Sequence, residues 1–293
     1  MGGYHPGAGR AIGIITLVVS AVLGSVYLLG RSLSLGPTQN DSTVAATGAD
    51  HSGYADQSAP SPTESGAGPT GAPGNGPNPP EHSAAPAHDD PNFGPLGTRM
   101  STGTDAVALT FDDGPHPEYT PQVLAILREY HVTATFCVVG ENAAAYPWLI
   151  QQIVAEGHTL CNHSWNHDVT LGSRSPERIR SDLLRTSAAI QAAVPDAPIA
   201  WYRQPGGAWT YSLISVVRDL GMMPLHWTVD PSDWRAPGET RIAAFVVAGA
   251  QPGSIVLLHD AGGDRQGTVN ALYRILPALT ARFDVHALPR RGT

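Results

Sequence analysis

The sequence contains no lysine: all 17 of its basic residues are arginine, against 25 acidic residues, so the formal net charge is −8 over 293 residues. The arginines are not gathered into one basic run, so the electrostatic footprint of a nucleic-acid-binding protein is missing. Only two cysteines are present, which excludes a small fold held together by several disulfides. The length instead allows one domain of about 200 residues or two smaller ones.

An uncharged apolar stretch covers residues 11–30 and lies between Arg10 and Arg31. As a helix it would be about 30 Å long, which matches the hydrocarbon thickness of a bilayer. A cleaved signal peptide is the alternative, although it predicts a shorter apolar region and a small-residue cleavage site. We interpret residues 1–31 as an N-terminal membrane anchor or signal segment. We favour a single-pass anchor in the cell membrane that leaves the rest of the chain extracellular, with secretion after cleavage as the alternative.

Residues 32–98 have few large apolar side chains and no basic residue, but eleven prolines and seven acidic residues. Such a composition cannot bury enough apolar surface to offset the entropy lost on ordering. The segment is therefore predicted to be a disordered linker with a random-coil reach of about 45 Å. It would hold a folded domain at residues 99–293 away from a membrane and within a cell wall.

Beyond Arg99, apolar runs of strand length alternate with helix-period stretches. The predicted strands are 106–111, 133–139, 159–162, 199–203, 222–228, 254–258 and 283–288. The predicted helices are 121–130, 147–156, 176–194, 211–220, 241–250 and 268–282. Strands rich in Val, Leu and Ile that alternate with helices are typical of a parallel sheet covered by helices. The sequence thus predicts an α/β domain, either a barrel with fewer than eight strands or an open doubly wound sheet.

Polar side chains follow five of the seven predicted strands. They are Asp112 and Asp113, His163 and His167, Arg203, Asp230 and Asp233, and His259 and Asp260. In parallel α/β folds the carboxyl ends of the strands form one rim, where ligands bind. Each residue alone has a simpler explanation, such as a turn at Asp112 or a core imidazole at His259. Their joint occurrence at successive strand ends nevertheless predicts one site.

Two imidazoles and one carboxylate form a three-ligand set that leaves coordination positions open for water and substrate. We assign Asp113, His163 and His167 as the ligands of a divalent metal, with zinc as the default and cobalt, nickel or manganese as alternatives. The side chain of Asp112 should diverge from that of its neighbour, which leaves Asp112 free to act as general base. Arg203 offers a bidentate fork that would orient this base.

Hydrolysis by a metal-bound water also needs a group that gives a proton to the leaving group. His259, on the opposite side of the site, is the candidate for this general acid. A carboxylate hydrogen-bonded to the second ring nitrogen of His259 would fix its tautomer and raise its pKa. We assign Asp230 to that role.

Five short motifs, in this order, resemble those of the NodB-homology polysaccharide deacetylases, carbohydrate esterase family four. They are Thr110-Phe111-Asp112-Asp113-Gly114-Pro115, His163-Ser164-Trp165-Asn166-His167, Arg203-Gln204-Pro205-Gly206-Gly207, Asp230-Pro231-Ser232-Asp233-Trp234 and Leu257-Leu258-His259. The resemblance covers about residues 104–290. It implies a distorted, incomplete (β/α)7-type barrel and metal-dependent removal of acetyl groups from N-acetylated or O-acetylated sugars. It supports the roles given above and implies that Trp234 and Leu257 wall a small pocket for the acetyl methyl.

Gly206 departs from the family pattern, because similar enzymes usually carry an aromatic residue there whose backbone N–H helps to hold the developing oxyanion. Glycine keeps this N–H but loses the ring and its stiffness. We therefore expect activity to survive and the affinity for nearby sugar rings to change.

The two cysteines, Cys137 and Cys161, lie in the second and third predicted strands, which would be neighbours in a parallel barrel. An exported domain is in an oxidising setting, where such cysteines can pair. Two buried reduced thiols are the alternative, and the strand register decides between them.

The predicted anchor and linker favour a substrate next to the cell. Cell-wall peptidoglycan or a chitin-like glycan is therefore the preferred substrate, with acetylxylan as an alternative. A metal-dependent hydrolase acting on a non-sugar amide and a catalytically inactive glycan-binding module are two further hypotheses. The binding module should have lost Asp112 or a metal ligand, and the other amidohydrolase should lack Trp234 or His259; all are present. The expected partners are a polysaccharide and, through residues 11–30, a membrane, with no nucleic acid and no obligate protein partner.

Overall fold

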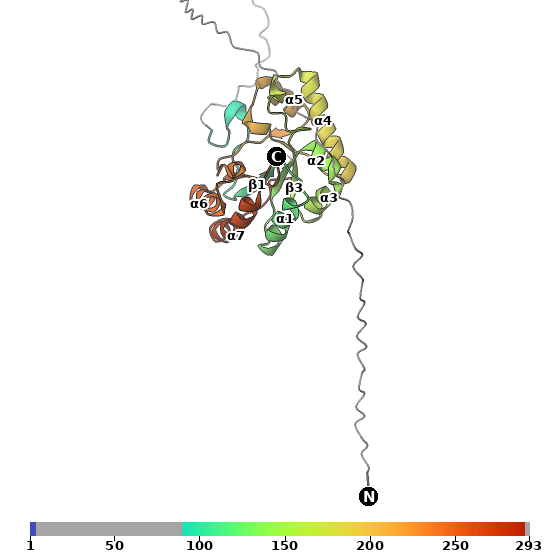
Figure 1. Cartoon of the computed structure of the whole chain (residues 1–293), viewed down its shortest axis with the longest axis vertical. Helices are drawn as coiled ribbons and strands as arrows, with labels where there is room; N and C mark the ends of the chain where they lie inside the picture. Colours follow the sequence, from blue (N-terminus) through green and yellow to red (C-terminus); the bar gives the residue numbers. More distant parts are fainter. Residues whose placement is uncertain (4–89, 291–293) are drawn as a thin grey trace, which may run out of the picture. The chain divides into compact units, whose positions relative to one another are not determined.

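The computed structural model describes residues 1–3 and 90–290. Within 90–290, six parallel strands form one sheet in the order β5-β4-β3-β2-β1-β6 (Figure 1). The strands are β1 (Ala108–Asp112), β2 (Thr135–Val138), β3 (Thr159–Asn162), β4 (Trp201–Tyr202), β5 (Met223–Pro224) and β6 (Ile255–His259). The sheet forms a half-barrel, and a single parallel bridge between Val229 and Val256 connects the segment after β5 to β6.

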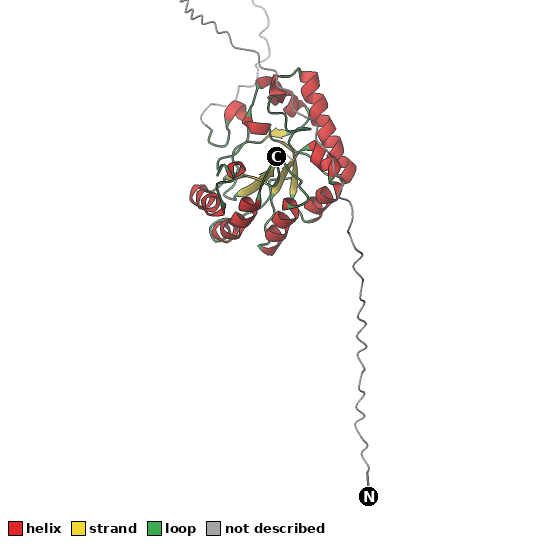
Figure 2. Ribbon diagram, in the orientation of Figure 1, coloured by secondary structure: helices red, strands yellow, loops and turns green. Residues whose placement is uncertain are grey.

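Helices surround the strands on the outside, as Figure 2 shows. They are α1 (Tyr119–Glu129), α2 (Gly140–Ala145), α3 (Pro147–Ala155), α4 (Pro176–Ala193), α5 (Tyr211–Asp219), α6 (Glu239–Gly249) and α7 (Gln266–Thr280). The six predicted helices are confirmed to within a few residues. The short helix α2 was not predicted, because six residues are too few to show an apolar period.

Alternation along the strands separates two layers of the core. Odd-numbered β1 side chains such as Leu109 and Phe111 pack with Phe136 of β2 and with the apolar faces of α1 and α7. Even-numbered Ala108 instead packs on the concave side, in a smaller cluster with Cys137 and residues of β3, β4 and β6. The strands are thus buried on both faces, which accounts for their nearly continuous apolar sequence.

The prediction of a seventh strand at 283–288 is wrong. In this segment Val285 makes one isolated bridge to Val107, and the chain then turns toward side chains of the inner layer. The Leu288 N–H donates to Thr135 Oγ1 at 3.0 Å, and the Thr159 hydroxyl donates to Leu288 O at 2.6 Å. Two backbone hydrogen bonds join residues 284 and 286 to Val107, and beyond them the segment satisfies its backbone with threonine hydroxyls rather than with a continued strand ladder. The fifth predicted strand, 222–228, is likewise reduced to the two residues of β5.

The folded region begins before Arg99, where the sequence boundary was drawn. The Met100 N–H donates to Asn92 O at 3.0 Å, and Arg218 of α5 donates to Gly97 O at 3.0 Å. Thr98 is fully buried. Residues 90–98, assigned to the linker from sequence, thus belong to the folded unit.

The predicted anchor at 11–30 lies outside the described residues, as does the linker from 32 to 89. Among the residues that the structure does describe, none of the helices is both long and apolar enough to span a bilayer.

Candidate active site

The strand alternation carries the candidate residues to the concave side of the sheet. Because side chains two residues apart share a face, four of the site residues continue the inward row of their own strand. These rows are Ala108-Thr110-Asp112, Thr159-Cys161-His163, Trp201-Arg203 and Ile255-Leu257-His259. The Cα atoms of Asp112 and His259 are register partners in β1 and β6. The expected common rim of site residues is therefore present.

Asp112 and Asp113 both approach His163, contrary to the expectation that consecutive side chains diverge. The His163 Nε2 atom lies 3.5 Å from Asp112 Oδ2 and 3.5 Å from Asp113 Oδ1. Asp113 has a φ of 73°, a left-handed conformation that aspartate tolerates better than most residues. This turn at the end of β1 brings the second carboxylate back toward the site.

Asp113, His163 and His167 are brought together as predicted for metal ligands. Their ligand atoms lie within 4.8 Å of one another, and His167 Nε2 is 3.2 Å from Asp113 Oδ1. The buried Asp113 Oδ1 has no hydrogen-bond partner among the described residues. His163 Nδ1 donates to Arg203 O at 2.7 Å, which leaves Nε2 as the free ligand atom. This donor set fits a divalent cation such as zinc.

The charges at this centre favour a cation. Burial raises the pKa of Asp113, but the neighbouring imidazole of His163, with those of His259 and His167, lowers it to about 2. Burial lowers the pKa of His163, but Asp112 and Asp113 outweigh it, so the pKa is raised overall. Positive charge at His163 Nε2 is thus stabilised by two carboxylates.

Asp112 is held by Arg203, but not by the predicted bidentate fork. A single guanidinium nitrogen, Arg203 Nη1, donates to Asp112 Oδ1 at 2.7 Å and to the Thr110 hydroxyl at 2.8 Å. The other terminal nitrogen is engaged elsewhere, because Nη2 donates to His226 O at 3.2 Å. Arg203 thus fixes one oxygen of Asp112 and leaves the other facing the metal ligands.

The carboxylate that orients His259 is Asp233, so the assignment of Asp230 is wrong. Asp233 Oδ1 accepts from His259 Nδ1 at 2.7 Å, while Asp233 Oδ2 accepts from the His259 N–H at 2.9 Å and the Thr268 hydroxyl at 2.7 Å. Asp230 instead accepts the Ser232 N–H at 2.7 Å. Ser232 is left-handed, with a φ of 53°, and this turn directs Asp233 inward.

The partnership with Asp233 keeps His259 protonated at neutral pH. Burial lowers the pKa of His259, but the Asp233 hydrogen bond and charge, helped by Asp112 and Asp113, raise it to about 9. Its Nδ1 is occupied by Asp233, so Nε2 remains to donate a proton.

A cavity of about 420 Å³ opens over these groups, and every predicted site residue except Arg203, Asp233 and Asp260 lines it. Leu257 is buried and Trp234 half exposed on its walls. Gly206 has a φ of 63°, and its N–H has no acceptor among the described residues. Asp230 also lines the cavity, although it does not reach His259.

Sequence reasoning missed Trp227 and Arg265, which line the same cavity. Trp227 packs so closely on Gly207 that a Cβ there would lie 2.9 Å from its ring. Buried Arg265 donates to Ala261 O at 2.6 Å and to Trp234 O at 3.3 Å. Trp227 stands three residues before the fourth motif and could have been found there, whereas Arg265 carries no sequence signal.

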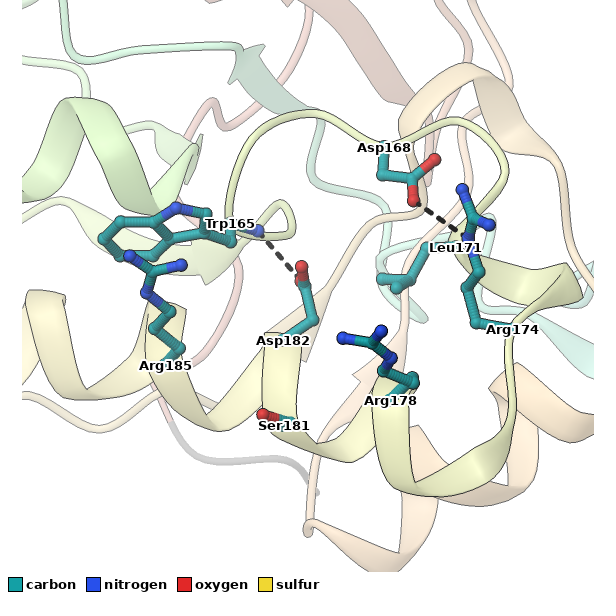
Figure 3. A pocket seen from close by; sticks show the side chains of 8 residues that line it. All are labelled: Trp165, Asp168, Leu171, Arg174, Arg178, Ser181, Asp182 and Arg185. Carbon is teal, nitrogen blue, oxygen red and sulfur yellow. Dashed lines mark hydrogen bonds and ion pairs between the residues drawn. The ribbon is translucent and has the colours of Figure 1, made fainter.

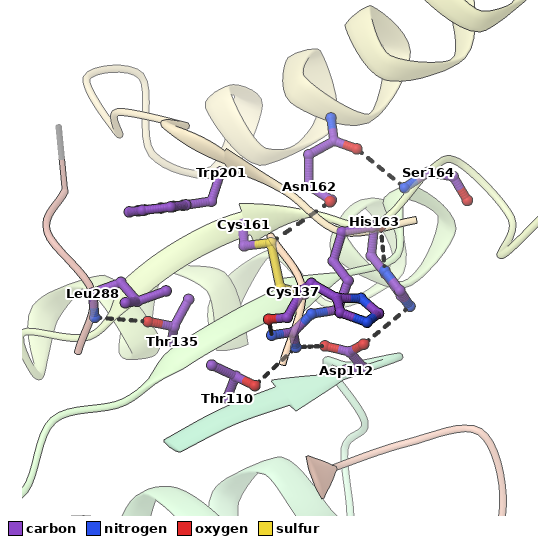
Figure 4. Close-up of a disulfide and its surroundings, with 12 residues drawn as sticks. Thr110, Asp112, Thr135, Cys137, Cys161, Asn162, His163, Ser164, Trp201 and Leu288 are labelled. Carbon is purple, nitrogen blue, oxygen red and sulfur yellow. Dashed lines mark hydrogen bonds and ion pairs between the residues drawn. A yellow bond between two sulfur atoms is a disulfide. The ribbon is translucent and has the colours of Figure 1, made fainter. Parts of the chain in front are cut away.

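Cys137 and Cys161 form a disulfide between β2 and β3, directly beneath the site (Figure 4). Their Cα atoms are register partners, and Cys137 is also the register partner of Asp112. This resolves the alternative left open by the sequence in favour of the bridge.

One rim of the parallel half-barrel thus carries a carboxylate held by arginine, a histidine held by a carboxylate and an Asp/His/His cluster. This arrangement is typical of a hydrolase active site. The polysaccharide deacetylase family model matches residues 99–225. A chitooligosaccharide deacetylase of Bradyrhizobium sp. is 41% identical over 201 residues, covering 64% of this chain and 91% of the relative. A peptidoglycan-N-acetylglucosamine deacetylase of Bacillus cereus is 40% identical over 175 residues, covering 59% of this chain and 81% of the relative.

A crystal structure of a peptidoglycan N-acetylglucosamine deacetylase superposes with a TM-score of 0.62 at 33% identity, covering 65% of this chain and 90% of the other. The chain belongs to the NodB-homology polysaccharide deacetylases, carbohydrate esterase family four, and is an enzyme of that class.

Proposed function

We propose that this chain is a divalent-metal-dependent deacetylase that removes N-acetyl groups from cell-wall peptidoglycan or a chitin-like glycan. The proposal rests on the groups that meet at one cavity. Asp113, His163 and His167 lie there together. Beside them are a base, Asp112, bound by Arg203, and an acid, His259, bound by Asp233. The relatives named for chitooligosaccharide and peptidoglycan deacetylation support this substrate class.

Asp113, His163 and His167 would hold the metal. When bound, a divalent cation supplies Lewis-acid polarisation of the acetyl carbonyl and makes water more acidic. Zinc fits two imidazoles and one carboxylate, and cobalt, nickel and manganese accept the same ligands.

Asp112 accepts the proton of the attacking water as that water adds to the acetyl carbonyl. Its Oδ1 is occupied by Arg203, so Oδ2 is the atom that receives the proton. The Gly206 N–H is available to donate to the oxyanion that develops on the carbonyl oxygen.

His259 then donates a proton from Nε2 to the departing amine nitrogen as the C–N bond breaks, so one water and one acetamide become acetate and an amine. Its raised pKa, about 9, keeps this proton in place at neutral pH. An amine leaving group needs protonation more than a sugar alkoxide does, so an acid that is protonated at neutral pH favours N-deacetylation over ester cleavage.

We further propose that the domain works outside the cell, attached to the membrane through residues 11–30 or released after cleavage. The apolar segment supports this, as does the buried disulfide, since such bonds persist in oxidising compartments. Protease added to intact cells should remove the catalytic domain if it is outside. Full protection of the domain from that protease would contradict the proposal.

Acetate release from N-acetylglucosamine oligomers, peptidoglycan and acetylxylan tests the activity. The wild-type chain should release acetate from the first two with an added divalent metal, and Asp112→Asn should release almost none. Glycan binding without any acetate release would favour the binding module, and faster release from acetylxylan would favour the esterase.

A further inference from the structure

A second cavity, of about 440 Å³, lies beside the active site and is rich in arginine (Figure 3). Its walls include Arg174, Arg178 and Arg185, together with Trp165, Asp168 and Asp182. Residues 178, 182 and 185 follow helical spacing along one face of α4. Arg174 joins them from the turn that precedes this helix.

The carboxylates of this cavity are already engaged. Asp168 accepts the N–H and the hydroxyl of Thr170, at 2.8 and 2.6 Å, and pairs with Arg174 Nε at 3.5 Å. Asp182 accepts the Trp165 N–H at 2.9 Å. Arg178 and Arg185 have no carboxylate within ion-pairing distance in the part of the chain that the structure describes. Two cations thus line one cavity without an ion pair of their own, although the Asp182 carboxylate lines it as well.

Arg185 is oriented rather than freely solvated. Its guanidinium carbon lies 3.6 Å from the centroid of the Trp165 ring, and such stacking leaves the N–H groups at the guanidinium edge available. Trp165 is itself fixed, because a Cβ at Gly140 would lie 2.5 Å from its ring. The stacked guanidinium therefore offers a fork suited to a planar oxyanion.

This cavity and the active-site cavity share one loop. His163 and His167 line the active-site cavity, whereas Trp165 and Asp168 line the arginine-rich one. His167 and Asp168 are consecutive, so their Cα atoms are about 3.8 Å apart. The two cavities therefore adjoin along this loop, and a polymer bound at the active site can continue toward the arginines.

We propose that Arg178 and Arg185 form an oxyanion subsite that binds carboxylate groups carried by the glycan chain, so that the enzyme favours carboxylate-bearing glycans over neutral ones. This inference rests on the proposed deacetylase function and specifies its substrate. Peptidoglycan carries such carboxylates on its peptide branches, whereas a chitin oligomer carries none. A phosphodiester polymer attached to the wall is the other source of oxyanions, and the test separates the two.

The test uses the full chain in a neutral detergent and the variants Arg178→Gln, Arg185→Gln and their combination. Arg241→Gln is the matched control, since Arg241 is exposed on α6 and lies outside both cavities. Three probes are compared: a neutral N-acetylglucosamine pentamer, peptidoglycan freed of teichoic acid, and the same peptidoglycan with teichoic acid attached. Acetate release and sedimentation binding are both measured.

Each single variant should lower kcat/KM and binding on teichoic-free peptidoglycan about tenfold, the effect of one charge-assisted hydrogen bond, while pentamer turnover and the Arg241→Gln protein stay unchanged. Equal losses of kcat/KM on the pentamer and on peptidoglycan would overturn the subsite. They would mean that the arginines only support the loop from His163 to Asp168, which both cavities share. Losses confined to the teichoic-acid probe would overturn the carboxylate assignment. If the wild type binds peptidoglycan and the double variant binds it equally well, the subsite is wrong whether or not acetate is released. Absence of acetate from every probe with the wild type would instead overturn the deacetylase function.

Discussion

His259 and Asp233 are joined at two points: the ring Nδ1 to Asp233 Oδ1 at 2.7 Å, and the backbone N–H to Asp233 Oδ2 at 2.9 Å. The carboxylate therefore sets both the tautomer and the orientation of the ring. It is also the largest influence that raises the pKa of His259 to about 9.

Asp233→Asn should move the alkaline limb of the pH–rate profile downward. Since the acid must be protonated, wild-type activity should fall as pH rises through about 9. Without the carboxylate charge the pKa of His259 falls toward its ordinary 6.5, so kcat at pH 8 should drop about 10-fold or more. Measuring kcat from pH 5 to 10 checks this.

The matched control is Asp230→Asn, which keeps an acceptor for the Ser232 N–H and should leave the alkaline limb in place. If Asp230→Asn and Asp233→Asn shift the limb equally, Asp233 is not the specific partner.

The pairing of His259 with Asp233 also makes the stability of the fold depend on pH. Because the pKa of His259 is raised in the folded state, the pairing stabilises the fold fully below pH 6.5, and this contribution is lost as pH rises through about 9.

Asp112→Asn should lower kcat by about 10²–10⁴-fold, the usual contribution of a general base, because the amide cannot accept a proton from water. Metal content and glycan affinity should remain, since Asp112 is outside the proposed ligand set. Metal analysis and acetate release on one protein preparation check both. Retention of wild-type turnover would remove Asp112 from the mechanism.

His163→Ala should abolish stoichiometric zinc binding and activity while leaving the fold intact, because the residue lies on the rim beyond the strands' main core. The exposed His286 is the control, and His286→Ala should bind zinc normally. Metal content after dialysis and circular dichroism are the measurements. A His163→Ala protein that still holds one zinc and turns over would disprove the ligand assignment.

Replacing Cys137 and Cys161 together by alanine should destabilise the domain by roughly 2–4 kcal/mol, the typical value for a native bridge. The same loss should appear when the wild type is treated with dithiothreitol under unfolding conditions. Denaturant midpoints compare the two proteins. Unchanged midpoints in both cases would mean that the bridge does not stabilise the fold.

A chain that begins at residue 90 should fold and deacetylate, whereas one that begins at 99 should melt several degrees lower. The shorter chain loses the hydrogen bonds at Gly97 and Met100 and the burial of Thr98, about 1–2 kcal/mol at roughly 2–4 °C per kcal/mol. Thermal melts of both chains provide the measurement. Equal melting temperatures would return residues 90–98 to the linker.

The sequence was sufficient for the parallel α/β class, six helices and most of the site, because apolar runs followed by polar residues at strand ends are local patterns. It could not separate Asp230 from Asp233, since the choice depends on a left-handed turn at Ser232. It could not foresee that Arg203 would divide its nitrogens between Asp112 and the His226 carbonyl. Both features are set by backbone geometry rather than by residue type or spacing.

The pairing of β1 with β6 also has a kinetic meaning. Asp112 and His259 are aligned across this strand pair, yet they come from opposite ends of the domain's sequence. Closing so long a loop is slow compared with local helix formation. Base and acid therefore meet only when the first and last strands associate, and recovery of acetate release during refolding should report that late event rather than the earlier gain of helix.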